Sequence, residues 1–461
     1  MLYHNGTLVT LDPARRIIAD GALHVEDGVI AAIGTRAELA ARLPPDHPRT
    51  DLRGGLVLPG LVNTHVHLAQ ALIRGCADDL ALVDWLTRRV WVLQGSYDAE
   101  DARLSAELAI LEMLRSGTTC FVESMLASHY GFDAIAGVVE RSGIRAALSK
   151  IVMDLPSYAQ APDSMHPGMV ESAEASFEEA LGLHARWDGA AQGRIQVWFG
   201  PRPPGGCTPA LYRRMMEAAA ARGMGVTVHL AEVREDVEHI RREHGLPAIE
   251  YARSVGMLGP RVLLVHVVWV GPEEIGLLAE TGTHVSHNPL SNSKLASGIA
   301  PIPEMLAAGV NVGLGTDGGP SSNDYDLVRA MRWASYLHKA RTLDPTLMPC
   351  EQVLEMATLN GARALGWDDR IGSLEPGKRA DFAVFDLDRP HLTPAPNPLS
   401  ALVCAGTGKD VHMVVIDGKV VVQDGQVLTL DQGRILAEAR ERAARLYRRA
   451  GIEIRPRWPV V

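Results

Sequence analysis

The sequence Leu-Val-Asn-Thr-His-Val-His at residues 61–67 predicts a buried strand that ends in two histidines. Seven more short apolar runs follow it, separated by helical stretches rich in Ala, Leu, Glu and Arg. The eight predicted strands are Leu61 to His67, Thr119 to Glu123, Ala146 to Val152, Ile195 to Gly200, Val226 to Leu230, Val262 to Val267, His284 to His287 and Val310 to Thr316. Repeated strand–helix alternation is typical of an α/β protein with a parallel sheet, and eight units predict a closed (β/α)8 TIM barrel.

An open, doubly wound sheet is the competing topology, because it shows the same alternation. That fold would need a glycine-rich phosphate loop after its first strand. The residues that follow His67 are Leu-Ala-Gln-Ala-Leu-Ile, without a glycine. The barrel is therefore the favoured fold.

The segments on either side of the predicted barrel indicate short strands and turns. An Asp-Gly pair at 27–28 separates two β-rich runs, and a second Asp-Gly pair at 417–418 does the same near the other end. Such a pair between apolar runs predicts a hairpin. Pattern alone does not decide whether the two ends share one sheet. A charged helix is expected on the surface at Arg434 to Arg449.

Composition and charge exclude several classes of protein. Of the 461 residues, 47% are hydrophobic, and 45 basic residues against 55 acidic ones give a net charge of −10. This charge disfavours nucleic acids and anionic membranes as partners. The longest apolar run, 262–270, is far shorter than the roughly 18 residues that cross a bilayer. The five cysteines never form a Cys-x-x-Cys pair, so we expect reduced thiols in a cytoplasmic protein.

Polar side chains gather at the predicted strand ends, where barrel active sites are built. His65 and His67 are two residues apart, so both point to the same side of a strand. A lone His-x-His pair is weak evidence, but five of the eight strand ends carry histidine or aspartate. The residues at the other four ends are His229, His266, His287 and Asp317. Buried imidazoles and carboxylates are costly unless they are paired, hydrogen-bonded or metal-bound, so a shared metal site is favoured over separate hydrogen bonds.

Three imidazoles and one carboxylate suit a divalent transition ion. Zinc fits best, while iron, manganese or cobalt would accept the same ligands. Such an ion lowers the pKa of a bound water toward about 7 and makes it a nucleophile. Asp317 could accept the proton of that water, Glu232 could carry a proton to a leaving group, and His266 could orient the nucleophile.

Four motifs in this order resemble the amidohydrolase superfamily. They are Pro59 to His67, His229-Leu230-Ala231-Glu232, Val285 to Pro289 and Gly315-Thr316-Asp317-Gly318. The resemblance extends over nearly the whole chain. Within the superfamily, the chain more specifically resembles the mononuclear-metal branch of s-triazine hydrolases and methylthioadenosine/S-adenosylhomocysteine deaminases.

The resemblance implies a barrel with a small composite β-sandwich made by both termini. The implied division is a β-domain at 1–58 and 372–430, a metal-dependent barrel at 59–371, and a C-terminal helix and tail at 431–461. It also implies a homo-oligomer. The implied metal ligands are His65, His67, His229 and Asp317, and the implied proton-transfer residues are Glu232 and His266.

A single metal ion is expected. Binuclear relatives bridge two metals with a modified lysine at the end of strand four, but here that strand ends in Gly200-Pro201-Arg202. Lys150 lies near strand three instead, and we expect it to be solvated or salt-bridged.

The substrate is less well determined by the sequence. Nucleoside deaminases of this branch are expected to have a glutamate at the position of Gln94 and a histidine at that of Arg202, and Gln94 resembles the s-triazine enzymes. The 316–324 loop is one residue longer than the corresponding loop that the resemblance to the s-triazine enzymes implies. Trp85, Gln94, Arg202 and Trp269 are predicted to line the pocket, with His287 and Asn288 behind the ligands.

The favoured function is a metal-dependent aminohydrolase that removes an amino group from a purine, pterin, pyrimidine or triazine ring. The first alternative is displacement of halide or alkylamine from an s-triazine. The second is deamination of methylthioadenosine or S-adenosylhomocysteine. The third is an inactive scaffold homologue, which would be expected to lack a ligand or the proton shuttle.

Overall fold

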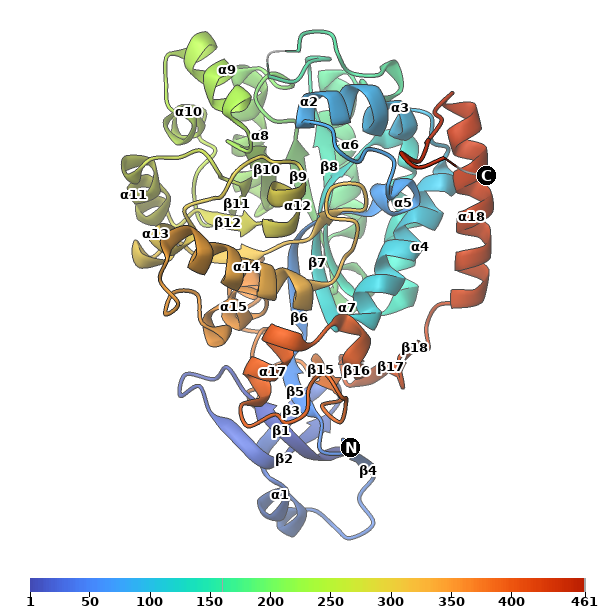
Figure 1. Ribbon diagram of the computed structural model, residues 1–461, viewed down its shortest axis with the longest axis vertical. Helices are drawn as coiled ribbons and strands as arrows, with labels where there is room; N and C mark the ends of the chain where they lie inside the picture. Colours follow the sequence, from blue (N-terminus) through green and yellow to red (C-terminus); the bar gives the residue numbers. More distant parts are fainter. Residues whose placement is uncertain (160, 460–461) are drawn as a thin grey trace.

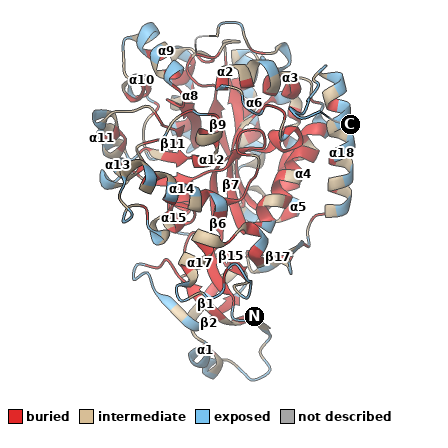
Figure 2. Ribbon diagram, viewed as in Figure 1, coloured by how far each residue is buried: buried red, intermediate tan, exposed pale blue. Residues whose placement is uncertain are grey.

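The chain folds into two sheets, and the computed structural model describes residues 1–159 and 161–459 (Figure 1). The first sheet closes into a barrel surrounded by helices, in the upper part of Figure 1. The second lies below it and contains strands from both ends of the chain. Figure 2 shows the barrel strands buried and the outward faces of the surrounding helices exposed.

The barrel is formed by parallel strands in chain order. They are β6 (Leu61–His67), β7 (Thr118–Leu126), β8 (Arg145–Val152), β9 (Ile195–Pro201), β10 (Val226–Leu230), β11 (Val262–His266), β12 (His284–His287), β13 (Val312–Leu314) and β14 (Asp317–Gly318). From β6 to β13 each strand pairs with the next, and β14, which continues the chain after β13, pairs with β6 through Asp317 and Val66. The predicted TIM barrel is therefore confirmed, and the open sheet is excluded.

The eighth strand differs from the prediction. The pattern predicted one strand at Val310 to Thr316, but the structure has two short pieces, β13 and β14. Asp317 has a φ of 65°, in the left-handed region, which interrupts the extended backbone. The interruption places this carboxylate at the mouth of the barrel beside β6.

Helices surround the barrel, except the first, α1, which packs on the terminal sheet (Figure 1). Their bounds are α1 (Arg36–Arg42), α2 (Leu82–Trp85), α3 (Trp91–Gln94), α4 (Ala99–Arg115), α5 (Phe132–Ser142), α6 (Ala173–Trp187), α7 (Ala190–Gly193), α8 (Pro209–Arg222), α9 (Arg234–His244), α10 (Ala248–Ser254), α11 (Pro272–Thr281), α12 (Pro289–Lys294), α13 (Ile302–Ala307), α14 (Leu327–Thr342), α15 (Cys350–Met356), α16 (Leu359–Ala364), α17 (Pro398–Ala405) and α18 (Gln432–Arg449). The last of these is the predicted charged helix. It runs along α4, where Arg442 Nη1 donates to Asp101 Oδ1 at 2.8 Å (Figure 1).

The terminal segments form one mixed sheet. Its strands are β1 (Leu2–Val9), β2 (Ile17–Glu26), β3 (Val29–Thr35), β4 (Arg49–Asp51), β5 (Leu56–Pro59), β15 (Phe382–Phe385), β16 (Val411–Ile416), β17 (Lys419–Gln423) and β18 (Gln426–Val427). β5 joins the two ends, because it pairs with β1 on one side and with β15 on the other. The composite β-domain is thus confirmed as a single continuous sheet, while the exact domain boundaries stay a prediction.

A buried ion network joins this sheet to the amino end of the barrel. Arg145 begins β8, is 1% exposed, and donates from Nε to Asp381 Oδ2 at 2.5 Å. Its Nη2 also donates to Asp417, whose backbone N–H donates to Asp381. Burial opposes the charge on Arg145, but the two carboxylates outweigh it and raise the pKa of the guanidinium.

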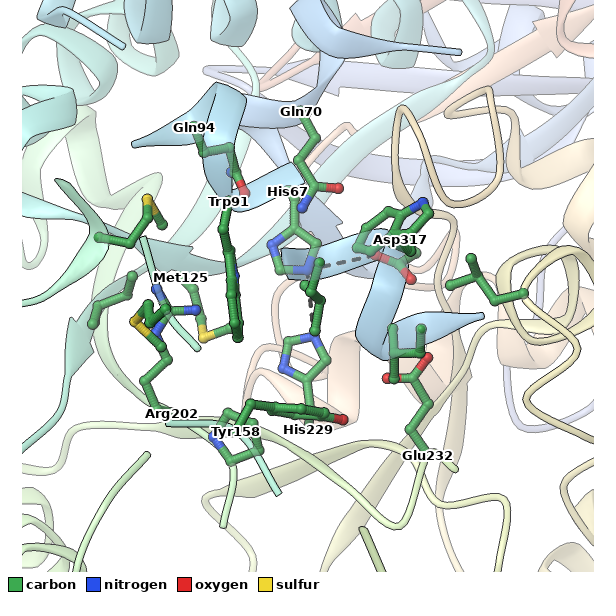
Figure 3. Close-up of a pocket in the computed structure, with 18 of the residues that line it drawn as sticks. His67, Gln70, Trp91, Gln94, Met125, Tyr158, Arg202, His229, Glu232 and Asp317 are labelled. Carbon is green, nitrogen blue, oxygen red and sulfur yellow. Dashed lines mark hydrogen bonds and ion pairs between the residues drawn. The ribbon is translucent and has the colours of Figure 1, made fainter. Parts of the chain in front are cut away.

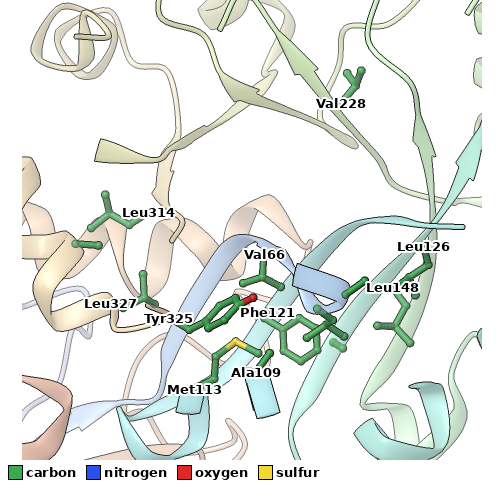
Figure 4. Close-up of a cluster of buried hydrophobic side chains, with 14 of the residues drawn as sticks. Val66, Ala109, Met113, Phe121, Leu126, Leu148, Val228, Leu314, Tyr325 and Leu327 are labelled. Atoms are coloured by element: carbon green, nitrogen blue, oxygen red, sulfur yellow. The ribbon is translucent and has the colours of Figure 1, made fainter. Parts of the chain in front are cut away.

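The outward face of β6 packs in the apolar core (Figure 4). Val66 lies against Phe121 and Tyr325 there, while the histidines on either side of it face the barrel mouth. The Tyr325 hydroxyl donates to the backbone carbonyl of His67 at 2.9 Å, which fixes the end of the strand.

Among the described residues, no helix is long and apolar enough to cross a bilayer.

Candidate active site

Four side chains from three strands converge at the carboxyl end of the barrel, and Figure 3 labels three of them: His67, His229 and Asp317. His65 and His67 come from β6, His229 from β10 and Asp317 from β14. Asp317 Oδ1 lies 3.4 Å from His65 Nε2 and 3.5 Å from His67 Nε2. His67 Nε2 lies 3.3 Å from His229 Nε2. Residues separated by 252 positions therefore face one small volume.

A glycine makes this convergence possible. A Cβ atom added to Gly315 would lie 2.2 Å from Asn288 Oδ1 and 2.8 Å from His65 Cβ. Both distances are far inside van der Waals contact, so only glycine leaves room for the side chains of the neighbouring strands. The Gly-Thr-Asp-Gly motif thus serves the site through its first residue as well as through Asp317.

The donor set fits a divalent metal ion. The ring nitrogens of His65, His67 and His229 lie within 4.8 Å of one another, and the same holds for the ligand atoms of His65, His266 and Asp317. Among the described residues, Nδ1 of buried His65 has no hydrogen-bond partner, and its Nε2 faces Asp317 Oδ1 at 3.4 Å. A buried imidazole that is only partly paired is costly unless it coordinates an ion. Three imidazoles and a carboxylate leave an open position of the kind found in hydrolytic sites.

The ionisation states also suit coordination. Burial lowers the pKa of His67 to about 3, aided by repulsion from His65, and lowers the pKa of His229 well below its usual range. Burial alone would raise the pKa of Asp317, but the surrounding imidazoles outweigh it and lower that pKa. Neutral imidazoles and an ionised carboxylate are the forms that bind metals.

His266 lies at the end of β11. It faces the second carboxylate oxygen of Asp317, Oδ2, whereas His65 and His67 face Oδ1. Its Nε2 lies 4.0 Å from Asp317 Oδ2 and 3.6 Å from Glu232 Oε2. Its Nδ1 lies 2.8 Å from Asn292 Oδ1 and 3.4 Å from Asn288 Nδ2. The amides fix the plane of the imidazole, so its other nitrogen is directed at the two carboxyl groups. Asn288 thus lies where the sequence predicted it, behind the cluster.

Glu232 is buried, in surroundings that favour the protonated form of its carboxyl. Burial raises the pKa of its carboxyl well above the usual range, and repulsion from Asp236 and Asp317 adds to the rise. Ser297 Oγ donates to Glu232 Oε1 at 3.3 Å. Asp236 accepts from the backbone N–H groups of Glu232 and Val233, which holds the strand end in place. A neutral carboxyl beside an ionised one is a common arrangement for a general acid.

A cavity of about 700 Å³ opens over this cluster. Three of the four predicted wall residues line it: Trp85, Gln94 and Arg202. The further wall residues that matter for a ligand are Gln70, Trp91, Met125, Tyr158, Met165 and Met169. The wall is thus aromatic and rich in methionine, with a few amide and guanidinium groups.

Trp269 and His287 lie elsewhere. Trp269 is not among the residues that line the cavity; its Nε1 donates to the Ser297 carbonyl at 2.8 Å, so it packs behind the segment that contacts Glu232. Ser286 faces the barrel interior, where its hydroxyl meets Thr64. Its neighbour His287 therefore points outward, toward His338 of α14 at 3.3 Å.

The chain matches a family model over residues 56–421, and the description of that model is amidohydrolase family. The chain belongs to this family. Among its amidohydrolase relatives is a 5′-deoxyadenosine deaminase of Methanosarcina mazei, 39% identical over 449 residues, 97% of this chain and 99% of that one. A 5-methylthioadenosine/S-adenosylhomocysteine deaminase of Desulforudis audaxviator is 41% identical over 426 residues, 92% of this chain and 95% of that one.

A solved amidohydrolase structure agrees with the fold. It is an adenosine deaminase from Xanthomonas campestris with bound zinc, with a TM-score of 0.90 and 33% identity over 97% of this chain and 98% of that one. These findings confirm the predicted class, a metal-dependent hydrolase of the deaminase type. Lys150 is buried and salt-bridged to Glu171 at 2.5 Å, which agrees with its predicted structural role.

Sequence reasoning missed several side chains of this amidohydrolase site. Asn292 and Ser291 both follow β12; Ser291 Oγ donates to Asp317 Oδ2 at 2.6 Å. Trp91 lies three residues before Gln94 on the same short helix, and that spacing could have pointed to it. Tyr158 comes from the loop after β8, where no periodic pattern marks it.

Proposed function

We propose that the protein deaminates an adenine nucleoside that lacks an ordinary 5′-hydroxyl, such as 5′-deoxyadenosine or 5′-methylthioadenosine. Water adds at C6 of the ring, the exocyclic amine leaves as ammonia, and an inosine-type product remains. One observation carries the proposal: His266 Nε2 lies 3.6 Å from Glu232 and 4.0 Å from Asp317, so two carboxyl groups and an oriented imidazole surround one volume beside the three histidines. The names of the relatives support the substrate class.

The protein's own groups divide the proton transfers. His65, His67, His229 and Asp317 would hold the ion, which when bound polarises a water and favours its deprotonation. Asp317 takes one proton from the attacking water and passes it to the exocyclic amine, which leaves as ammonia. The second proton of the water returns to Glu232 as the new carbonyl forms. Glu232 donates its proton to the ring nitrogen next to the reacting carbon, which makes that carbon more electrophilic. His266, fixed through Asn292, stabilises charge on the incoming oxygen.

The cavity wall suits the rest of such a substrate. Trp85, Trp91 and Tyr158 offer faces on which a planar purine stacks. The thioethers of Met125, Met165 and Met169 form a soft apolar surface for a methyl or methylthio group. The Gln94 amide is placed to hydrogen-bond a ribose diol, without the charge that a glutamate would add.

The test is ammonia release from 5′-deoxyadenosine, 5′-methylthioadenosine and adenosine by metal-replete protein. The proposal expects turnover of the first two with a higher kcat/KM than adenosine. A chlorinated s-triazine is included, and chloride release without nucleoside turnover would replace the proposal by the triazine alternative. A protein that stays inert after zinc and iron are added would favour the scaffold alternative.

We also propose zinc as the ion, because a site of three imidazoles and one carboxylate suits it and the Xanthomonas relative holds zinc. Elemental analysis of protein purified without added metal would distinguish zinc from iron. The cytoplasm is the proposed location, supported by five cysteines that form no disulfide. The homo-oligomer, and the absence of nucleic-acid partners, stay predictions.

A further inference from the structure

Arg202 is a buried cation in the cavity wall, directly after β9. Its side chain lines the cavity, and the residue is 4% exposed. Among the described residues, its Nε and Nη2 atoms have no hydrogen-bond partner and no carboxylate pairs with it. An arginine stays charged at all ordinary pH values. A buried charge without a counter-ion is one of the most expensive features that a folded protein can contain.

Glu171 is the carboxylate whose charge acts on Arg202, but it is already paired with other groups. Burial lowers the pKa of Arg202, and Glu171 opposes that effect from a distance. However, Glu171 Oε2 accepts from Lys150 Nζ at 2.5 Å, and its Oε1 accepts from the Ser128 backbone at 2.8 Å. The protein therefore neutralises Lys150 and leaves Arg202, in the same region, without an anion.

The guanidinium of Arg202 lies near an aromatic ring of the cavity wall. Its Cζ lies 5.8 Å from the centre of the Trp91 ring, at the outer limit of a cation–π contact. In Figure 3, Trp91 is seen edge-on with Arg202 on one side and His67 and His229 on the other. A ligand group that meets the guanidinium is thus separate from the group that reacts beside the histidines.

We propose that Arg202 selects substrates that carry a carboxylate remote from the reacting ring carbon, binding it through the paired N–H groups of the guanidinium. The inference rests on the proposed function and deepens it. A guanidinium matches the two oxygens of a carboxylate in a bidentate pair, which is stronger and more directional than a bond to a neutral acceptor. Binding of the substrate supplies the counter-ion that the protein leaves out.

The first experiment compares two nucleosides that differ in this group. S-adenosylhomocysteine carries a carboxylate and 5′-methylthioadenosine does not. The ratio of their kcat/KM values is measured for the wild type, R202M and R202K. R202M should lower the ratio by about 10- to 100-fold, mainly through KM, because a charge-assisted bidentate pair is lost. R202K should recover part of the ratio, since it restores the charge without the fork.

R234M is the matched control. Arg234 also lies over a tryptophan, with Cζ 4.3 Å from the ring centre of Trp269, but neither residue lines the cavity. R234M should leave the ratio unchanged. Equal losses on both nucleosides in R202M would overturn the inference and assign Arg202 to holding Trp91. If methylthioadenosine is deaminated with no preference that depends on Arg202, the proposed function stands and the inference fails.

A second measurement covers the case in which neither nucleoside releases ammonia. Pterin-6-carboxylate and pterin are planar amino-heterocycles that differ only in the carboxylate. Their binding to wild type and R202M is followed by quenching of tryptophan fluorescence. A 10-fold or larger loss for the carboxylate alone supports the role of Arg202 even if the proposed function is wrong. Equal binding of both compounds by both proteins refutes it.

Discussion

Two buried arginines at opposite ends of neighbouring barrel strands have contrasting surroundings. Arg145, at the start of β8, meets two carboxylates, and its Nε and Nη2 both donate to them. Arg202, after the end of β9, meets none among the described residues. The first joins the barrel to the terminal sheet, and the second faces a cavity. The buried charge of Arg145 therefore stabilises the fold at one end of the barrel, while the buried charge of Arg202 is free to bind a ligand at the other.

Backbone conformation also shapes the carboxyl end of the barrel. At the carboxyl end, three residues of the site have a positive φ: Ala231 at 53°, His266 at 73° and Asp317 at 65°. Each such conformation costs roughly 1–3 kcal/mol in a residue other than glycine. The packing of the barrel offsets this cost. The positive φ values turn the side chains at the strand ends toward one volume. The following predictions test this contrast between the two ends.

The largest expected effect is on D317N. The amide removes a ligand and the base that accepts the water proton, so ammonia release should fall by about 10⁴-fold, the upper range for losing a catalytic base. Metal content should fall as well, while circular dichroism and the unfolding midpoint stay close to those of the wild type. Turnover at the wild-type rate would contradict the proposed mechanism.

E232Q separates chemistry from metal binding. The amide cannot donate the proton that the raised pKa of Glu232 keeps in place, so kcat should fall by about 10²- to 10³-fold. Metal content should be unchanged, because Glu232 is not among the four proposed ligands. Elemental analysis beside the ammonia assay gives both values. A variant that loses its metal instead would show that Glu232 acts as a ligand.

R145M and R202M compare the two arginines directly. R145M leaves buried Asp381 and half-buried Asp417 without their main partner, so the free energy of unfolding should fall by about 3–5 kcal/mol. R202M removes a charge that has no partner, so stability should be unchanged or slightly higher. Urea unfolding of both variants measures the difference. Equal destabilisation by both would mean that the contrast between the two ends is false.

The strand ends were the most predictable part of the molecule. His65, His67, His229 and Asp317 could be placed together because strand ends of a parallel barrel meet at one edge, whatever their separation in sequence. The order of the motifs then identified the family. Trp85, Gln94 and Arg202 line the cavity, while their contact with a substrate stays a prediction.

The errors came from orientation and from irregular segments. His287 follows Ser286 on a strand, and only the contact of Ser286 with Thr64 shows which of the two points inward. Trp269 follows a strand whose last residue has a positive φ, so alternation no longer predicts its direction. Asn292 and Tyr158 belong to a short helix and a loop, where no period marks a residue as part of the site.

The smallest expected effect concerns the outward-facing pair of His287 and His338. Burial, together with the nearby charge of Arg341, lowers the pKa of His338 from 6.5 to about 4. The unfolded chain binds this proton below pH 6.5, while the folded protein resists it until about pH 4. Stability contributed by the neutral imidazole is therefore complete above pH 6.5 and is lost as the pH falls toward 4, by about 1.4 kcal/mol per unit. H338Q, whose amide can still hydrogen-bond His287, should lose less stability than the wild type between pH 7.5 and 5.5. Urea unfolding at the two pH values measures this, and parallel losses would show that another group titrates.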